Sequence, residues 1–275
     1  MVLQLSLVSS IDDDSYDLCV STLSNLCGNP PIVFGNFTAM LKPNPAFDIE
    51  QVNSKNQLVE QSRIKLSKGL PLHEVEPDNA KRDFRILKKY QNDEVEGLDP
   101  QIMQDMLYGS RDLDEMEVDG ETNKGGSTTQ NAWSLSISDI PTAGSGRKVS
   151  TQAITETTVL ASGGSSPSII SFLSELGYVL DFQLLVLGIK FNMNNGVFLE
   201  LSKIWRLNDG RTEQITKGGF LVKAFVNVAK STDIKSINLG TTSLLALQKE
   251  LSGYVELEIP DRKSMDSRLE NKNDI

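Results

Sequence analysis

Residues 178–207 read YVLDFQLLVLGIKFNMNNGVFLELSKIWRL, and this stretch predicts two long β-strands joined by a turn. Asn195 and Gly196 stand between two apolar segments, and an Asn-Gly pair in that place is a strong local signal for a β-hairpin. We therefore expect strands over 178–193 and 197–207. Both are longer than the usual strand of about five or six residues. Long antiparallel strands are the feature from which the predicted fold class follows.

Further segments alternate between apolar and polar residues, as a strand with one buried face does. In one of them Trp133, Leu135 and Ile137 fall on the same face, with serines on the other. Strands are predicted over residues 2–8, 32–42, 58–66, 84–90, 133–140, 149–162, 219–230 and 253–262. Helical spacing of apolar residues predicts helices over 16–27, 167–176 and 242–252, each ended by a glycine.

Long strands that follow one another as hairpins usually curl and close, because closure removes the exposed sheet edges. The sequence therefore predicts a mainly β protein. We expect a closed antiparallel β-barrel of about eight strands with a few flanking helices. Residues 1–275 are predicted to form a single barrel domain.

The negative charge of the chain is concentrated in one segment. The formal net charge is −10, and the stretch from Asp93 to Glu121 holds eleven acidic residues and one basic residue. The remainder is formally neutral, which gives no electrostatic reason to expect a phosphate-rich partner as the main ligand; a local basic patch stays possible. Because residues 92–130 combine like charge with few apolar groups, they are predicted to be a disordered insert. Residues 261–275 are predicted to be a polar tail.

Both cysteines, Cys19 and Cys27, fall in the first predicted helix, where about 12 Å of rise separates them. A disulfide needs α-carbons within about 7 Å, so we predict two buried free thiols. The amino terminus lacks the basic flank of a signal peptide. The apolar run at 184–189 is too short to span a membrane. These features predict a soluble intracellular protein.

Histidine or cysteine chemistry finds little support in this chain. Histidine occurs once, as His73, so neither a Ser-His-Asp arrangement nor a zinc cluster can be assembled. The AGSGRK segment at 143–148 lacks the spacing of a phosphate-binding loop and is predicted to be a turn. Trp133 and Trp205 lie among apolar neighbours on strand patterns, and we expect both in the core.

One stretch, GYVELEIPDR at 253–262, raises the alternative of a metal-dependent enzyme. Alternation would place Glu256 and Glu258 on one face of a strand, where two carboxylates could hold a divalent cation. Glu200 on a nearby strand could join them, and Lys203 or Lys223 could hold substrate phosphates. If the barrel interior were wet, such a site would suit a metal-dependent phosphatase.

The first predicted strand argues against that alternative. It offers Gln4 and Ser6 where a tunnel enzyme would need a second pair of carboxylates. Isolated carboxylates bind divalent metals weakly, because a site of oxygen ligands needs about six donors. We therefore favour a solvated or salt-bridged strand face for Glu256 and Glu258. No catalytic, metal-binding or cofactor-binding residue is predicted.

Several long stretches, in the same order along the chain, resemble the yeast Mediator complex subunit 18 family. They are GNPPIVFGNF (28–37), LKPNPAFDIEQVNSKNQLVE (41–60), RIKLSK (63–68), WSLSISDIPTAG (133–144), ITKGGFLVKAFVNV (215–228) and DRKSMDSR (261–268). The acidic insert and residues 70–82 lie outside the resemblance.

The resemblance implies a non-enzymatic subunit of the nuclear Mediator head module, which links activators to RNA polymerase II. It implies a closed barrel similar to that of fungal RNA triphosphatases. It also implies two direct partners, a related barrel called Mediator subunit twenty and a carboxy-terminal helix of Mediator subunit eight. Other head-module subunits and RNA polymerase II are implied as wider partners. Neither a membrane nor sequence-specific nucleic acid is expected as a partner, and no cofactor is expected. The sequence assigns no partner-binding residues.

Overall fold

The computed structural model describes residues 1–47, 61–70, 107, 132–144, 146–160, 168–208 and 211–269. Its strands are β1 (Val2–Asp12), β2 (Ile32–Pro43), β3 (Ile64–Gly69), β4 (Ala132–Ser138), β5 (Ser150–Leu160), β6 (Tyr178–Asn192), β7 (Phe198–Asn208), β8 (Arg211–Gln214) and β9 (Gly219–Val228). Its helices are α1 (Tyr16–Cys27), α4 (Ile169–Glu175) and α5 (Ile234–Leu251), and a single 3-10 turn (Asp13–Ser15) precedes α1.

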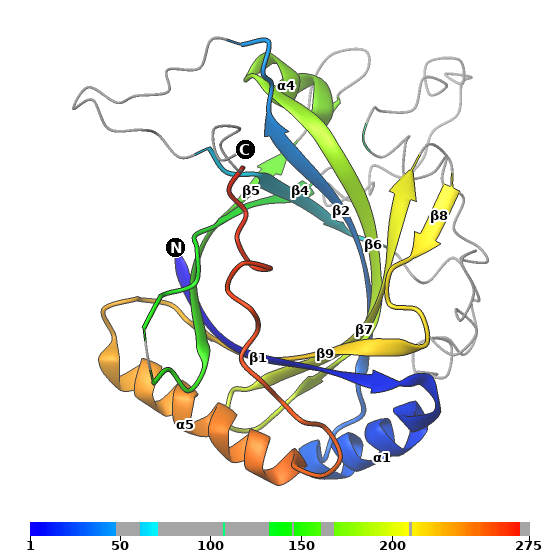
Figure 1. Cartoon of the computed structure of the whole chain (residues 1–275), viewed down its shortest axis with the longest axis vertical. Coiled ribbons are helices and arrows are strands. Elements are labelled where there is room, and N and C mark those ends of the chain that lie inside the picture. Colours follow the sequence, from blue (N-terminus) through cyan, green and yellow to red (C-terminus); the bar gives the residue numbers. More distant parts are fainter. Residues whose placement is uncertain are drawn as a thin grey trace, which may run out of the picture.

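Eight of these strands close into an antiparallel barrel (Figure 1). They follow one another around the ring in the order β6-β2-β3-β4-β5-β1-β9-β7, and β7 pairs back onto β6. The short strand β8 stays outside the ring and pairs only with the end of β7 among the described strands. The predicted fold class, a closed antiparallel barrel of about eight strands, is confirmed.

The β6–β7 hairpin is the longest predicted feature, and the structure confirms it. The two strands pair continuously from Gln183↔Leu207 to Asn192↔Phe198. Gly196 in the connecting loop has a φ of 79°, a conformation that glycine adopts without steric cost. The loop spans residues 193–197 and is longer than the predicted two-residue turn.

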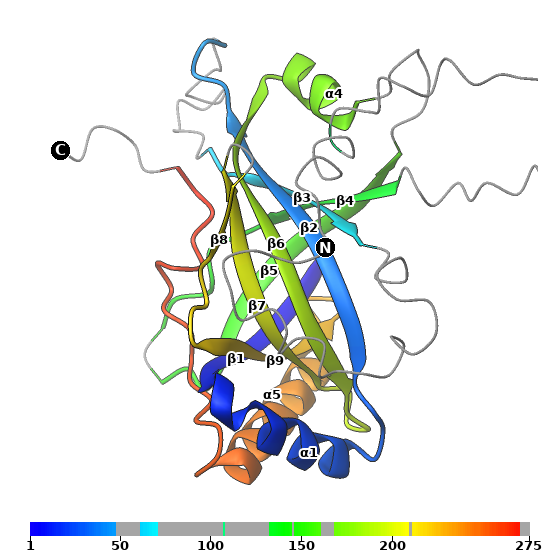
Figure 2. The same ribbon diagram turned by 90° about the vertical axis from the view of Figure 1, so that its right-hand side faces the viewer.

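Helices α1 and α5 lie outside the barrel, beneath the wall formed by β1, β9 and β7 (Figures 1 and 2). Tyr16 of α1 stacks on Phe220 of β9, with ring centroids 4.3 Å apart. Gly240 of α5 approaches the wall so closely that an added Cβ would lie 3.0 Å from the Leu5 and Val226 side chains. The side chains of Leu5, Phe220 and Val226 therefore point outward, into a core shared with the helices.

Alternation then fixes the opposite face of each strand toward the barrel interior, which we call the lumen. On β1 the outward Leu5 and Leu7 are fully buried under the helices. Gln4 and Ser6 alternate with them in the sequence and face the lumen. The same division runs around the wall, because paired residues on neighbouring strands share a face. The main apolar core thus lies outside the barrel wall. The inner face carries the polar side chains together with some apolar ones, among them the stacked pair Phe198 and Phe225.

Three predicted elements differ from the structure. Strand β3 begins at Ile64 and overlaps the strand predicted over 58–66 only at residues 64–66. Helix α5 begins at Ile234, eight residues before the predicted start, with the side chain of Asp233 accepting a hydrogen bond from the Ser236 amide as its cap. The predicted strand over 253–262 is wrong, because within it only Glu258 forms a bridge, to Val8 of β1. The short strand β8 is not among the predicted strands.

The remaining expectations have separate outcomes. The predicted strand over 84–90 and His73 lie outside the described residues. Of the insert over 92–130 the structure describes Leu107, which is helical and fully buried in the core, with its carbonyl accepting a hydrogen bond from Ser168 Oγ at 2.9 Å. Both cysteines are free, as predicted, but Cys27 is buried while Cys19 is half-buried. Burial raises the pKa of the Cys19 thiol to about 11, so this thiol stays protonated and weakly reactive at neutral pH.

Both tryptophans are in the core, as predicted: Trp133 is 2% exposed and Trp205 is fully buried. In the described part of the chain, none of the helices has the length and apolar character needed to cross a membrane.

Candidate functional site: the barrel lumen and the segment across its mouth

The lumen face of the barrel is lined with polar side chains contributed by most of its strands. Those that are buried and face inward are Gln4, Ser6, Thr38, Ser136, Ser150, Gln152 and Ser202. Gln4 shows how they are satisfied: its side-chain amide donates to Asn227 Oδ1 at 3.0 Å and its carbonyl accepts from Lys223 Nζ at 2.8 Å. A hydrogen-bonded lining of this kind is compatible with a hydrated interior.

Two rows of charged side chains, with five members in total, also face the lumen. Lys65 and Glu156 flank Ser136 in register across β3, β4 and β5. Lys223, Glu200 and Lys190 are in register across β9, β7 and β6. Within the second row, Lys190 Nζ lies 3.3 Å from Glu200 Oε1.

The surrounding protein perturbs two of these lysines. Burial lowers the pKa of Lys65, and the negative charges of Glu156 and Glu200 only partly oppose that effect. Burial likewise lowers the pKa of Lys223, to about 8; Glu200 opposes the shift, while the positive charges of Lys65 and Lys190 add to it. A charged group that has lost much of its water is destabilised in this way. Keeping Lys65 and Lys223 protonated in the lumen therefore costs folding free energy.

The residues of the enzyme alternative do not come together. Glu200 faces the lumen, but Glu256 is exposed at the end of α5, where its carboxylate accepts a hydrogen bond from the Gly253 amide at 2.7 Å. Glu258 joins the barrel only through its backbone, and its side chain is exposed. Lys203 points out of the barrel, where its Nζ lies 2.7 Å from Asp13 Oδ1.

Lys223 does reach the lumen. Of the residues considered for the enzyme alternative, Lys223 and Glu200 are the two that face it. Among the described residues, no group of three or more His, Cys, Asp and Glu side chains is placed to hold a metal ion.

Residues 253–269, the C-terminal segment, cross one mouth of the barrel. Figure 1 shows this segment in front of the ring, and the turned view in Figure 2 places it along one end of the barrel. Two backbone hydrogen bonds join Glu258 to Val8, with N–O distances of 2.7 and 2.8 Å. They occupy the part of β1 beyond Ser6, where its register with β5 ends.

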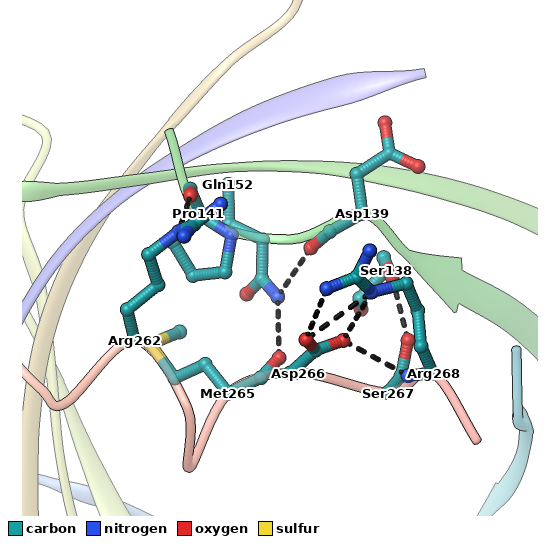
Figure 3. Close-up of polar contacts among 9 residues, drawn as sticks. All are labelled: Ser138, Asp139, Pro141, Gln152, Arg262, Met265, Asp266, Ser267 and Arg268. Atoms are coloured by element: carbon teal, nitrogen blue, oxygen red, sulfur yellow. Dashed lines mark hydrogen bonds and ion pairs between the residues drawn. The ribbon is translucent and has the colours of Figure 1, made fainter. Parts of the chain in front are cut away.

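The second half of the C-terminal segment is tied to the loop between β4 and β5 (Figure 3). Arg262 Nε donates to the carbonyl of Pro141 at 2.9 Å. The amide of Gln152, a lumen residue, donates to the carbonyls of Asp139 at 2.8 Å and Met265 at 3.2 Å. Ser267 Oγ donates to the carbonyl of Ser138 at 2.7 Å. The segment thus contacts both the rim and the inner face of the wall.

The end of the segment pairs with the residues that lead into β3. Arg268 bridges to Ser62, and the amide of Arg63 donates to the carbonyl of Ser267 at 2.8 Å. Asp266 holds the Arg268 guanidinium, with a closest N–O distance of 2.8 Å, and the hydrogen bonds from Arg268 lower the pKa of this carboxyl. A single segment therefore links three neighbouring wall strands, β1, β5 and β4, and the residues that lead into β3. The sequence signal for it is the alternation at 255–259, which places Val255, Leu257 and Ile259 on one face. Val255 and Leu257 are buried, whereas Ile259 is 38% exposed.

An apolar hollow lies between α1 and the end of α5. Its volume is about 190 Å³, and its lining includes Leu18, Cys19, Leu251 and Tyr254. Leu18 and Tyr254 are 62% and 69% exposed, which is high for large apolar groups. Such exposed apolar groups, rimmed by polar residues, are suited to contact another protein. The sequence pattern assigned Leu18 no role, because it lies off the stripe that binds α1 to the barrel.

Comparisons with known proteins cover almost the whole chain. The family model described as Med18 protein matches residues 3–268. The Saccharomyces cerevisiae protein named Mediator of RNA polymerase II transcription subunit 18 is 44% identical, with 99% of each chain covered. The Eremothecium gossypii protein of the same name is 43% identical, with both chains covered completely.

A solved structure agrees on the fold. A chain in the structure of the Schizosaccharomyces pombe Mediator head module superposes with a TM-score of 0.59. The match covers 97% of this chain and 100% of that one, at 12% sequence identity. At that identity the likeness concerns the fold, and it extends over nearly all of this chain and the whole of that one.

Proposed function

This chain belongs to the Mediator complex subunit 18 family, and from that premise we propose that it is a subunit of the Mediator of RNA polymerase II transcription. The observation that carries the proposal is the match at 44% identity over 99% of both chains. Its work is protein binding in the head module, which helps to connect regulators with the polymerase. Its place of action is the nucleus.

The proposed role is that of a scaffold without catalysis. In support, Glu200 is in the lumen while Glu256 lies outside it and Glu258 makes its contact through the backbone. Lys203 is turned outward and paired with Asp13. A carboxylate-based phosphatase needs several acids converging on one metal, and the candidates of this chain are dispersed. Metal-dependent release of phosphate from a triphosphate substrate by the purified chain would contradict this part of the proposal.

The proposed direct partners are a related barrel, Mediator subunit twenty, and a carboxy-terminal helix of Mediator subunit eight. A rigid closed barrel is a suitable platform for both kinds of contact. A stable contact between two barrels should bury at least about 1,200 Å² in total. A partner helix would be recognised through apolar anchors spaced one helical turn apart.

Incorporation into Mediator tests the proposal in cells. We expect a tagged copy of this chain, expressed in Saccharomyces cerevisiae in place of the native subunit 18, to co-purify with the other Mediator subunits. The 44% identity over the full length is the reason to expect that the binding surfaces are compatible. Mass spectrometry of the purified complex would measure the stoichiometry, with the tag alone as control. A chain that is folded by circular dichroism yet absent from purified Mediator would contradict the proposal.

A further inference from the structure

The two rows of lumen charges face each other across the barrel. Lys65 lies on β3, whereas Glu200 and Lys223 lie on β7 and β9, which are not neighbours of β3 in the ring. The electrostatic effects of Glu200 on Lys65 and of Lys65 on Lys223 therefore act through the lumen. This arrangement brings lysines from separate walls toward a common space.

Positive charge exceeds negative charge in this space. The two rows contain three lysines and two glutamates, and the ion pair with Lys190 engages one of the glutamates. The other, Glu156, accepts a hydrogen bond from Ser134. Lys223 donates to a neutral group, Gln4 Oε1. Among the described residues, neither Lys65 nor Lys223 has a carboxylate oxygen within 4.0 Å.

Water reaches these charges even though protein surrounds them. Lys65 and Glu156 are exposed, and Lys223 is half-buried. The side chains of Lys190 and Glu200 are 32% and 24% exposed. Because all five point into the barrel, this exposure is to solvent inside the lumen or at its mouths. A small solute that passes a mouth of the barrel can reach the same charged groups.

We propose that the lumen is a binding site for a compact phosphate-type oxyanion, held between the ammonium groups of Lys65 and Lys223. Lysine is a common phosphate ligand that acts as a compact point charge with three donors. An oxyanion would provide the countercharge that the wall lacks, in a space where reduced hydration strengthens electrostatic attraction. The side-chain amide of Gln4 and the hydroxyl groups of Ser6 and Ser136 offer neutral donors on the same inner face. This inference is independent of the proposed role in Mediator.

Calorimetric titration of the purified full-length chain with pyrophosphate tests the proposal. We expect saturable binding that the double variant Lys65→Met with Lys223→Met weakens by about tenfold or more, since each lysine would make a charge-assisted contact. Lys68→Met is the matched control, because Lys68 lies on β3 three residues from Lys65 and faces outward, over the Trp133 ring. Absence of saturable binding, or equal binding by the double variant and the control, would overturn the proposal.

Two further arms sharpen the test. A nucleoside diphosphate carries the same diphosphate group, so weaker binding than pyrophosphate identifies a free anion as the ligand, and tighter binding identifies a phosphorylated organic molecule.

Sulfate, whose charge is constant near neutrality, reports on the lysines of the wild-type chain. Since the pKa of Lys223 is about 8, we expect sulfate binding to weaken as the pH rises from 7 to 9. The other lumen groups facing Lys223 are Lys65, Lys190, Glu156 and Glu200. Sulfate binding that stays constant across this range would count against a contact with Lys223.

Discussion

Replacing Leu257 by alanine should lower the free energy of unfolding by about 2–5 kcal/mol, the range for truncating a buried leucine. Leu257 is 2% exposed and belongs to the hydrophobic core, although it lies in a segment without regular secondary structure. Its carbonyl accepts a hydrogen bond of 2.6 Å from the Gln248 side chain of α5. The substitution would leave a cavity where the C-terminal segment joins the barrel to α5. Urea unfolding followed by circular dichroism measures the change.

The matched control is Ile259→Ala, two residues further along the same segment. Ile259 is 38% exposed, so its truncation removes less buried area and should cost clearly less than Leu257→Ala. Equal effects of the two substitutions would mean that the segment contributes no specific packing. The pair therefore separates an anchored segment from a loosely attached tail.

Replacing Lys223 by methionine should have the opposite sign and stabilise the protein by about 1–3 kcal/mol at pH 7. The lowered pKa, about 8 against an ordinary value of 10.5, means that the folded state holds the charged ammonium less favourably than the unfolded state does. Loss of the hydrogen bond to Gln4 offsets part of the gain, by about 1 kcal/mol. Methionine has a similar length and no charge, so it can occupy the same space.

The pH dependence fixes the sign of this effect. Below pH 8 Lys223 is protonated in both states, and the destabilisation is fully present. Between pH 8 and 10.5 the folded state has lost a proton that the unfolded state still binds, so the stability of the wild-type chain rises with pH. The advantage of Lys223→Met should therefore shrink across that interval. Thermal unfolding at pH 7 and pH 9.5 measures it, with Lys249→Met at an exposed site of α5 as control. A variant less stable than wild type at pH 7 would contradict the account.

A lysine that destabilises the folded state is readily understood if it binds an anion. The stability predicted for Lys223→Met and the anion binding predicted for the wild-type chain are two measurements on one group. A gain in stability combined with a loss of binding is the pattern of a site that trades one for the other.

The sequence was sufficient to predict the wall of the barrel, for a local reason. Alternation placed Leu3, Leu5 and Leu7 on one face of the first strand, and the hairpin signal at Asn195 and Gly196 paired the two longest strands. Alternation alone does not say which face of a strand points toward the barrel axis. The orientation depends on where α1 and α5 pack. Because both helices lie outside the barrel, the apolar face of the first strand points outward and its polar face points inward.

The missed features depend on tertiary contacts. The first half of α5 contains Asn238, Gly240 and two threonines, which are weak helix formers, and it is held by packing against Leu5 and Val226. Residues 253–262 alternate as a strand does, but apart from the bridge between Glu258 and Val8 they follow the rim of the barrel. The lumen charges are far apart in the sequence, and only the ring order brings Lys65 toward Lys223. No local pattern predicts such a meeting.

The most direct test of the central claim is reconstitution of the proposed partners. This chain would be co-expressed with the relatives of Mediator subunit twenty and the carboxy-terminal segment of subunit eight, and the mass of the eluted species would be measured by light scattering on a sizing column. We expect one species containing all three chains in equal amounts. Elution of this chain alone, in a folded state, would contradict the claim that it serves as a binding scaffold for these partners.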